Sequence, residues 1–253
     1  MLRYDTALLD NPIWNSLITE HSALALGDNH ALRYPSEIGP LAGIPALTPA
    51  SFHSLRQLAG GGIIGLLSLD PFQVPPGWKV IREGPLVQMI RNRTSEETDA
   101  SADMGADVGA PGPSLLGTGE ESSPSTTLRQ LTPADAPAMV ALAHLTEPGP
   151  FNLRTMELGN FYGIFHGDRL VSMAGKRMHL PALQEVSGVC THPDARGHGY
   201  ARQLMSIVIG EIESEGKTAF LHMMATNPAI RLYEQLGFTL RQRFQFVVLA
   251  VES

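Results

Sequence analysis

A predicted β-strand that runs through a glycine-rich turn into a helix restricts the fold of this sequence more than any other feature. The strand is expected over residues 182–191, and the turn reads Arg-Gly-His-Gly-Tyr-Ala over residues 196–201. The first N–H groups of the following helix have no partner within it and lie at the positive end of its dipole. Gly197 and Gly199 leave the backbone open to close approach, so the segment predicts a phosphate-binding site. Apolar residues at helical spacing support the helix, namely Ala201, Leu204, Met205, Val208 and Ile212.

Strands and helices alternate around this segment, which predicts an α/β fold with a mixed sheet. Pro133 after Thr132 and Pro228 after Asn227 are typical of helix starts. The helices are expected over residues 12–25, 51–58, 133–145 and 228–236, the last with Ile230, Leu232, Tyr233 and Leu236 on its buried side. The other strands are expected over residues 62–69, 79–90, 128–131, 161–165, 170–178, 218–224 and 244–251.

The negative charge of the chain lies in one segment, residues 94–127. This segment holds seven acidic and no basic residues, whereas the whole chain holds 25 acidic and 18 basic residues, so the flanking parts are neutral. It is rich in Ser, Thr, Gly and Ala, and such a composition buries too little surface to offset its chain entropy. We therefore expect a disordered linker between an N-terminal lobe at residues 1–93 and a C-terminal lobe at residues 128–253.

Composition and charge exclude several classes of protein. Neutral lobes argue against a nucleic-acid surface, which needs clustered basic residues. No apolar run reaches the length of a signal peptide or a membrane span, so we expect a cytoplasmic protein without membrane contact. A single cysteine excludes an intrachain disulfide, and the nine histidines show no spacing typical of metal ligands. That cysteine, Cys190, is interpreted as a packed thiol and not as a nucleophile, because no carboxylate accompanies the nearby His192.

Three motifs of the C-terminal lobe resemble those of the GNAT superfamily of N-acetyltransferases. The turn over residues 196–201 resembles the acyl-CoA signature of that superfamily, Arg/Gln-x-x-Gly-x-Gly/Ala. The segment over residues 227–238, which ends in Leu-Tyr-Glu-Gln-Leu-Gly-Phe, is similar to a second motif. The run Val-Cys-Thr-His-Pro-Asp over residues 189–194 resembles the branch related to glycine N-acyltransferases. The resemblance implies a GNAT fold for residues 128–253 and suggests a degenerate GNAT-like N-terminal lobe that covers the open side of the C-terminal lobe.

The resemblance also implies an activity, the transfer of an acyl group from acyl-CoA to a primary amine by direct attack in a ternary complex. Acetyl-CoA is the expected cosubstrate, without a metal. A small-molecule amine and a peptide N-terminus both remain open as acceptors. A CoA-binding regulatory protein or pseudoenzyme, with a sensing N-terminal lobe, is the alternative function. For an enzyme, deletion of the predicted linker is expected to leave catalysis largely intact.

Residue roles follow from the same resemblance. The backbone near Val189, Cys190 and Thr191, together with Asn227, is expected to contact the pantetheine arm. The backbone amides of the turn are expected to cradle the pyrophosphate, and they belong to Arg196, Gly197, His198, Gly199, Tyr200 and Ala201. Tyr233 is expected to protonate the departing thiolate, and Glu185 is the candidate general base.

Each catalytic assignment has a structural alternative. Glu185 is also explained as a carboxylate at the solvated start of a strand, and Tyr233 as a core aromatic residue. His222 is a second candidate for the base and is also explained as a core histidine with satisfied hydrogen bonds.

Overall fold

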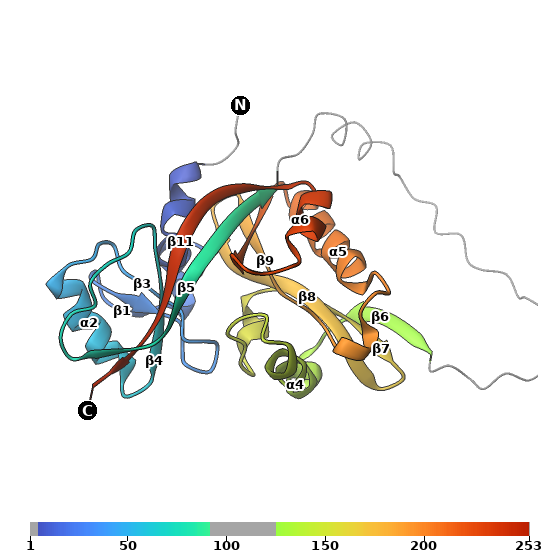
Figure 1. Cartoon of the computed structure of the whole chain (residues 1–253), viewed down its shortest axis with the longest axis horizontal. Coiled ribbons are helices and arrows are strands. Elements are labelled where there is room, and N and C mark those ends of the chain that lie inside the picture. The colour runs from blue at the N-terminus through green and yellow to red at the C-terminus, as the bar shows by residue number, and fades with distance from the viewer. Residues whose placement is uncertain (1–4, 92–124, 253) are drawn as a thin grey trace, which may run out of the picture.

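The computed structural model describes residues 5–91 and 125–252, and its central element is an eight-stranded mixed sheet (Figure 1). The strands lie in the order β4-β11-β5-β10-β9-β8-β7-β6. Their bounds are β4 Ile63–Ser68, β5 Trp78–Arg91, β6 Thr126–Gln130, β7 Phe161–His166, β8 Arg169–Leu180, β9 Leu183–Thr191, β10 Thr218–Met224 and β11 Phe238–Val251. Strands β9 and β10 run parallel to each other, and the other neighbouring pairs are antiparallel. The predicted α/β fold with a mixed sheet is confirmed.

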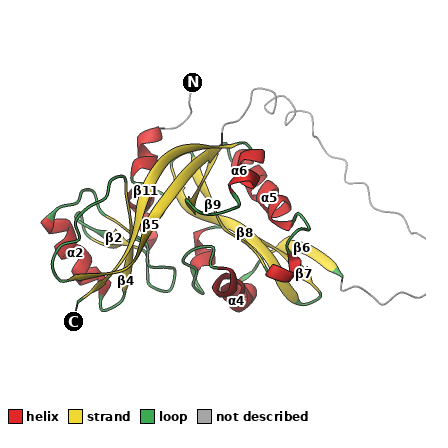
Figure 2. Cartoon of the chain, in the orientation of Figure 1, coloured by secondary structure: helices red, strands yellow, loops and turns green. Residues whose placement is uncertain are grey.

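The helices pack around this sheet, and a small second sheet completes the N-terminal part (Figure 2). The α-helices are α1 Pro12–Ile18, α2 Pro49–Ala59, α4 Ala136–Thr146, α5 Tyr200–Ser214 and α6 Ile230–Gln235. Short 3-10 helices span Thr6–Asp10, Ser22–Leu24, Pro133–Asp135, Thr155–Leu158 and Pro193–Ala195. The small sheet consists of β1 Leu26–Gly27, β2 Leu32–Arg33 and β3 Ala42–Gly43.

Two details of the predicted helices are wrong. The helix expected over residues 12–25 ends at Ile18, because Thr19 leaves the helical conformation, with φ −121 and ψ −105, and donates its N–H to the carbonyl of Ser16. The Nδ1 atom of His21 lies 3.1 Å from the hydroxyl of Ser16 and 2.9 Å from that of Tyr34. In α6, Ile230 is 38% exposed instead of buried, since it lies in the first turn of a six-residue helix.

The N-terminal segment contributes two strands to the main sheet. Strand β5 lies between β10 and β11, with Gln88 opposite His222 on one side and Gln242 on the other. Strand β4 extends the same sheet beyond β11. The segments before and after the predicted linker thus share one sheet, and their division into two lobes stays a prediction.

The predicted linker lies mostly outside the described residues, which resume at Ser125. Its predicted end is wrong, because Thr126 and Thr127 belong to β6 and pair with His166 and Phe165.

Helices α4 and α5 cover opposite faces of β8 and β9. Met173 of β8 packs with Met139 and Leu142 of α4, whereas the next residue, Ala174, packs with Leu204 and other residues of α5. Consecutive residues of a strand point to opposite faces of a sheet, so the two helices lie on different sides. The buried residues of α5 confirm the predicted apolar face, and they are Leu204, Met205, Val208, Ile209 and Ile212.

Candidate active site

Strands β9 and β10 pair over only a short stretch and then separate. Their parallel pairing joins residues Leu183, Gln184 and Glu185 to Thr218, Ala219 and Phe220. Beyond it, Val186 to Val189 of β9 and Leu221 to Met224 of β10 line a cavity of about 1310 Å³. The backbone of β9 is therefore open to a ligand where the two strands diverge.

A glycine produces the bend in β9 at this point. Gly188 has φ +64, and a Cβ atom there would lie 2.8 Å from Cε1 of Phe161, so a larger residue would be both strained and crowded. The pairing of β9 with β8 shifts register in the same region, between Met173 and Gly175. This irregularity changes the direction of the strand next to the cavity, as β-bulges commonly do beside functional sites.

The predicted phosphate turn connects β9 to α5 and is exposed to solvent. Gly197 and Gly199 have φ +83 and +76, and no atom lies within 4 Å of a Cβ placed at either position. The ring of His198 stacks on that of Tyr200 at 5.4 Å between centroids, and the Tyr200 hydroxyl lies 2.9 Å from Nε2 of His166. The open N-terminus of the 15-residue helix α5 thus faces outward, although this turn is not part of the cavity lining.

Three of the predicted site residues line the cavity itself: Val189, Asn227 and Tyr233. The Oδ1 atom of Asn227 accepts the N–H of Ala229 at 2.9 Å, which orders the start of α6. Tyr233 is 6% exposed, and burial raises the pKa of its hydroxyl to about 12. The phenol is therefore protonated at neutral pH and able to donate its proton.

Cys190 and Thr191 lie at the end of β9, outside the cavity lining. The Thr191 hydroxyl lies 2.8 Å from that of Ser172. Cys190 is 7% exposed and packs beneath α4, and burial raises the pKa of its thiol to about 11. A thiol with this pKa is protonated at neutral pH, which supports the interpretation as a packed cysteine.

The carboxylate of Glu185 is completely buried and accepts four hydrogen bonds. Arg177 donates two of them, from Nε at 2.7 Å and from Nη2 at 2.8 Å. Nδ1 of His222 lies at 2.7 Å and the N–H of Met178 at 3.3 Å. Burial alone would raise the pKa of Glu185, but the charge and hydrogen bonds of Arg177 and the hydrogen bond from His222 lower it to about 2. The expectation of a solvated carboxylate is wrong, and a group with so low a pKa is a weak proton acceptor.

Hydrogen bonds determine where His222 carries its proton. Arg241 donates to Oε1 of Gln88 at 2.9 Å, and the carbonyl of Leu9 accepts from Nε2 of Gln88 at 2.9 Å, which fixes the orientation of the Gln88 amide. The same Nε2 lies 3.0 Å from Nε2 of His222, which must therefore accept. The proton of neutral His222 is then on Nδ1 and is donated to Glu185. His222 also lines the cavity, but both of its ring nitrogens are engaged, by Glu185 and by Gln88, as expected for a histidine with satisfied hydrogen bonds.

Three residues of this site were not predicted from the sequence. Arg177 could have been found, because antiparallel pairing of the strands expected over residues 170–178 and 182–191 would place it close to Glu185. Gln88 had no local signal, since its strand enters the sheet from a distant part of the chain. Glu147 lines the cavity as an exposed carboxylate and has φ +48, a conformation uncommon for residues other than glycine. Its position just after α4 carried no sequence signal.

The described residues contain neither a group of His, Cys, Asp and Glu side chains able to hold a metal ion nor a helix long and apolar enough to span a membrane.

Comparisons with known proteins identify the family. The FR47-like protein family matches residues 161–247, from β7 into β11. A crystal structure from Novosphingobium aromaticivorans, described as an acetyltransferase of the GNAT family, is 37% identical, covers 97% of this chain and 99% of its own, and superposes with a TM-score of 0.77. The GCN5-related N-acetyltransferase of Kribbella flavida shares the fold at 14% identity and a TM-score of 0.55, over 94% of this chain and 93% of its own. A search of curated proteins found no match. The chain belongs to the GNAT family of acetyltransferases.

Proposed function

We propose that this protein transfers an acyl group, acetyl in the first instance, from acyl-CoA to a primary amine by direct attack in a ternary complex. The observation that carries the proposal is the divergence of β9 and β10 after Glu185, which opens the backbone of β9 to a cavity lined by Asn227 and Tyr233. The sequence over residues 189–194 resembles the branch of the superfamily related to glycine N-acyltransferases. Membership of this chain in that branch stays a prediction.

The chain offers each part of acyl-CoA a suitable partner. The backbone of β9 near Val189 to Thr191 would pair with the pantetheine arm, with Asn227 on the opposite wall. The N–H groups at the start of α5 suit a pyrophosphate, because they are unpaired within the helix and Gly197 and Gly199 put no side chain in the way. Arg196 and Arg202 add positive charge beside them.

Tyr233 is the proposed proton donor. The amine nitrogen attacks the thioester carbonyl carbon, a C–N bond forms, and the C–S bond breaks as the tetrahedral intermediate collapses. The sulfur leaves as a thiolate and takes the proton of the Tyr233 hydroxyl. The products are the amide and free CoA, and Tyr233 regains a proton from solvent.

The proton lost by the attacking amine needs an acceptor other than a strongly hydrogen-bonded carboxylate. We assign this role to Glu147, acting directly or through water, since its carboxylate is exposed at the cavity wall. Glu185, the candidate from the sequence, has a pKa near 2 and its oxygens are occupied by Arg177, His222 and Met178. In this assignment Glu185 fixes the side chains of Arg177 and His222 in the cavity wall through its hydrogen bonds to them.

The experiment that tests the proposal measures acetyl-CoA binding by calorimetry and thiol release with a broad panel of primary amines. Binding together with amine-dependent thiol release is expected. Binding without turnover for any amine would instead favour the alternative, a CoA-binding regulatory protein or pseudoenzyme. Absence of acetyl-CoA binding would contradict both.

A further inference from the structure

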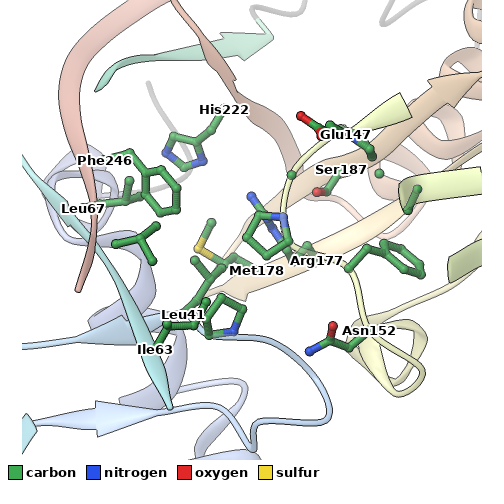
Figure 3. A pocket seen from close by; sticks show the side chains of 18 of the residues that line it. Leu41, Ile63, Leu67, Glu147, Asn152, Arg177, Met178, Ser187, His222 and Phe246 are labelled. Carbon is green, nitrogen blue, oxygen red and sulfur yellow. The ribbon is translucent and has the colours of Figure 1, made fainter. Parts of the chain in front are cut away.

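The cavity has two sides of different character. Figure 3 shows Glu147 and Ser187 on one side, and Leu41, Ile63, Leu67 and Phe246 on the other. The first side adjoins the divergence of β9 and β10, where the proposed acyl transfer takes place. The second side is built largely by the N-terminal segment and β11. Figure 3 also places His222 on the side of Phe246. A ligand that fills the whole cavity therefore meets Glu147 and Ser187 at one end and mainly apolar side chains at the other.

The apolar side is formed by side chains of several elements that meet across the sheet. Strands β1, β4, β5, β8 and β11 and the loop before β3 supply them, and they are Leu26, Leu41, Ile63, Leu67, Ile81, Leu86, Met178, Phe246 and Val248. Ile63 and Ile81 are 45% and 51% exposed, although both belong to strands of the main sheet. Large apolar side chains gathered and exposed in one concave surface are typical of a ligand site.

The charged residues on this side leave its apolar character intact. Arg33 is buried, and it donates from Nε to the carbonyl of Tyr34 at 3.0 Å and from Nη1 to that of Leu58 at 2.9 Å. Its guanidinium thus closes the end of α2. The side chains of Glu37 and Arg82 are exposed and of opposite charge. This side therefore does not favour a ligand with a strong net charge.

We propose that the apolar side binds the body of the acceptor, and that the acceptor is an amine attached to an apolar body of several carbon atoms. This inference rests on the proposed function, because the thioester must lie where β9 and β10 diverge and the CoA arm must lead away towards the turn at residues 196–201. The space on the N-terminal side is then left for the acceptor. Its amine reaches the thioester beside Glu147, while its body displaces water from Ile63, Leu67 and Ile81.

A homologous series of straight-chain amines, from ethylamine to octylamine, tests the inference with acetyl-CoA as donor. The value of kcat/KM should rise about fourfold for each added methylene group until the apolar side is filled. Ile63→Gln and Ile81→Gln should each lower the ratio of the octylamine value to the ethylamine value by about tenfold or more. Leu240→Gln is the matched control, because Leu240 is also an exposed strand residue, at 53%, but does not line the cavity. This control should leave the ratio unchanged.

Calorimetry of octylamine binding separates this inference from the proposed function. If no amine is acetylated although octylamine binds more tightly than ethylamine and Ile63→Gln weakens it, the proposed function fails, and the apolar side is retained only as a binding site for apolar amines. Equal kcat/KM values along the series, with octylamine binding no tighter than ethylamine, would overturn the inference while leaving the proposed function intact. A dependence on the length of the acyl chain instead of the amine, lost in Ile63→Gln, would also overturn it and assign this side to the acyl group.

Discussion

Arg177 and Glu185 form a two-point ion pair across the β8–β9 hairpin, with distances of 2.7 Å from Nε to Oε2 and 2.8 Å from Nη2 to Oε1. The Glu185 side chain is completely buried and that of Arg177 is 13% exposed. Arg177 also lines the cavity, so the pair links the cavity wall to a buried carboxylate that in turn holds His222.

Removal of one partner should destabilise the protein strongly. Arg177→Met leaves the Glu185 carboxylate buried without its counter-charge, so the free energy of unfolding should fall by about 3–5 kcal/mol. Arg177→Met combined with Glu185→Leu should recover part of this loss, because the buried charge is gone. Urea unfolding measures both. The exposed pair of Arg154 and Glu157 is the control, and Arg154→Met should cost less than about 1 kcal/mol. Equal losses in the single and double variants would contradict a buried, coupled pair.

The low pKa of Glu185 makes a specific contribution to acid stability. The folded-state pKa of about 2 lies below the ordinary value of 4.5, so the ionised form is favoured by folding. This contribution is fully present above about pH 4.5 and is lost as the pH falls towards 2. The unfolding free energy of the wild type should therefore fall more steeply between these pH values than that of Glu185→Gln. Parallel curves for the two proteins would show that Glu185 titrates normally.

A matched pair of substitutions tests Glu147 as the proton acceptor. Its φ of +48 is tolerated better by Asn and Asp than by most other residues, so Glu147→Asn and Glu147→Asp should both fold. Glu147→Asn should lower kcat by about a hundredfold and Glu147→Asp by less, because only the latter keeps a carboxylate. Glu37→Gln, which removes another carboxylate of the cavity, is the control. Full activity of Glu147→Asn would contradict Glu147 as the proton acceptor.

Substitution of two glycines with similar backbone conformations separates an effect on acetyl-CoA binding from an effect on stability. Gly199 and Gly216 have φ +76 and +74, and a Cβ at either position meets no atom within 4 Å. Substitution of either by Ala should therefore cost a similar amount of stability, about 1–2 kcal/mol. Only Gly199→Ala should weaken acetyl-CoA binding, by about tenfold or more in calorimetry, because Gly199 lies in the proposed pyrophosphate turn. Equal affinities of the two variants would remove this turn from the binding site.

Sequence reasoning succeeded where structure is determined locally. Thr132 before Pro133 marked a helix start that the structure confirms, and the Asp135 carboxylate there accepts the N–H of Thr132 at 2.8 Å. The helix expected from Pro228 instead begins at Ile230. The strand, glycine turn and helix from Leu183 to Ser214 also follow from local patterns. Nothing local placed β5 between β10 and β11, because that pairing joins residues more than a hundred positions apart.

Several residues of the site were predicted from the sequence, but the charge environment of Glu185 was not. The motif placed Asn227 and Tyr233 at a common cavity, whereas the state of Glu185 depends on Arg177 from the facing strand and on His222 from the parallel one. Which ring nitrogen of His222 carries the proton depends further on its hydrogen bond with Gln88 of β5. Burial and partner identity decide a pKa, and both depend on tertiary packing.

Tyr233→Phe tests the central claim most directly, since it removes the proposed proton donor and leaves the ring. Thiol release in single-turnover and steady-state assays should fall by about a hundredfold, because the thiolate must leave unprotonated, while the Kd of acetyl-CoA in calorimetry should change by less than about twofold. An unchanged rate with unchanged binding would contradict Tyr233 as the proton donor and the account of acyl transfer given for this site.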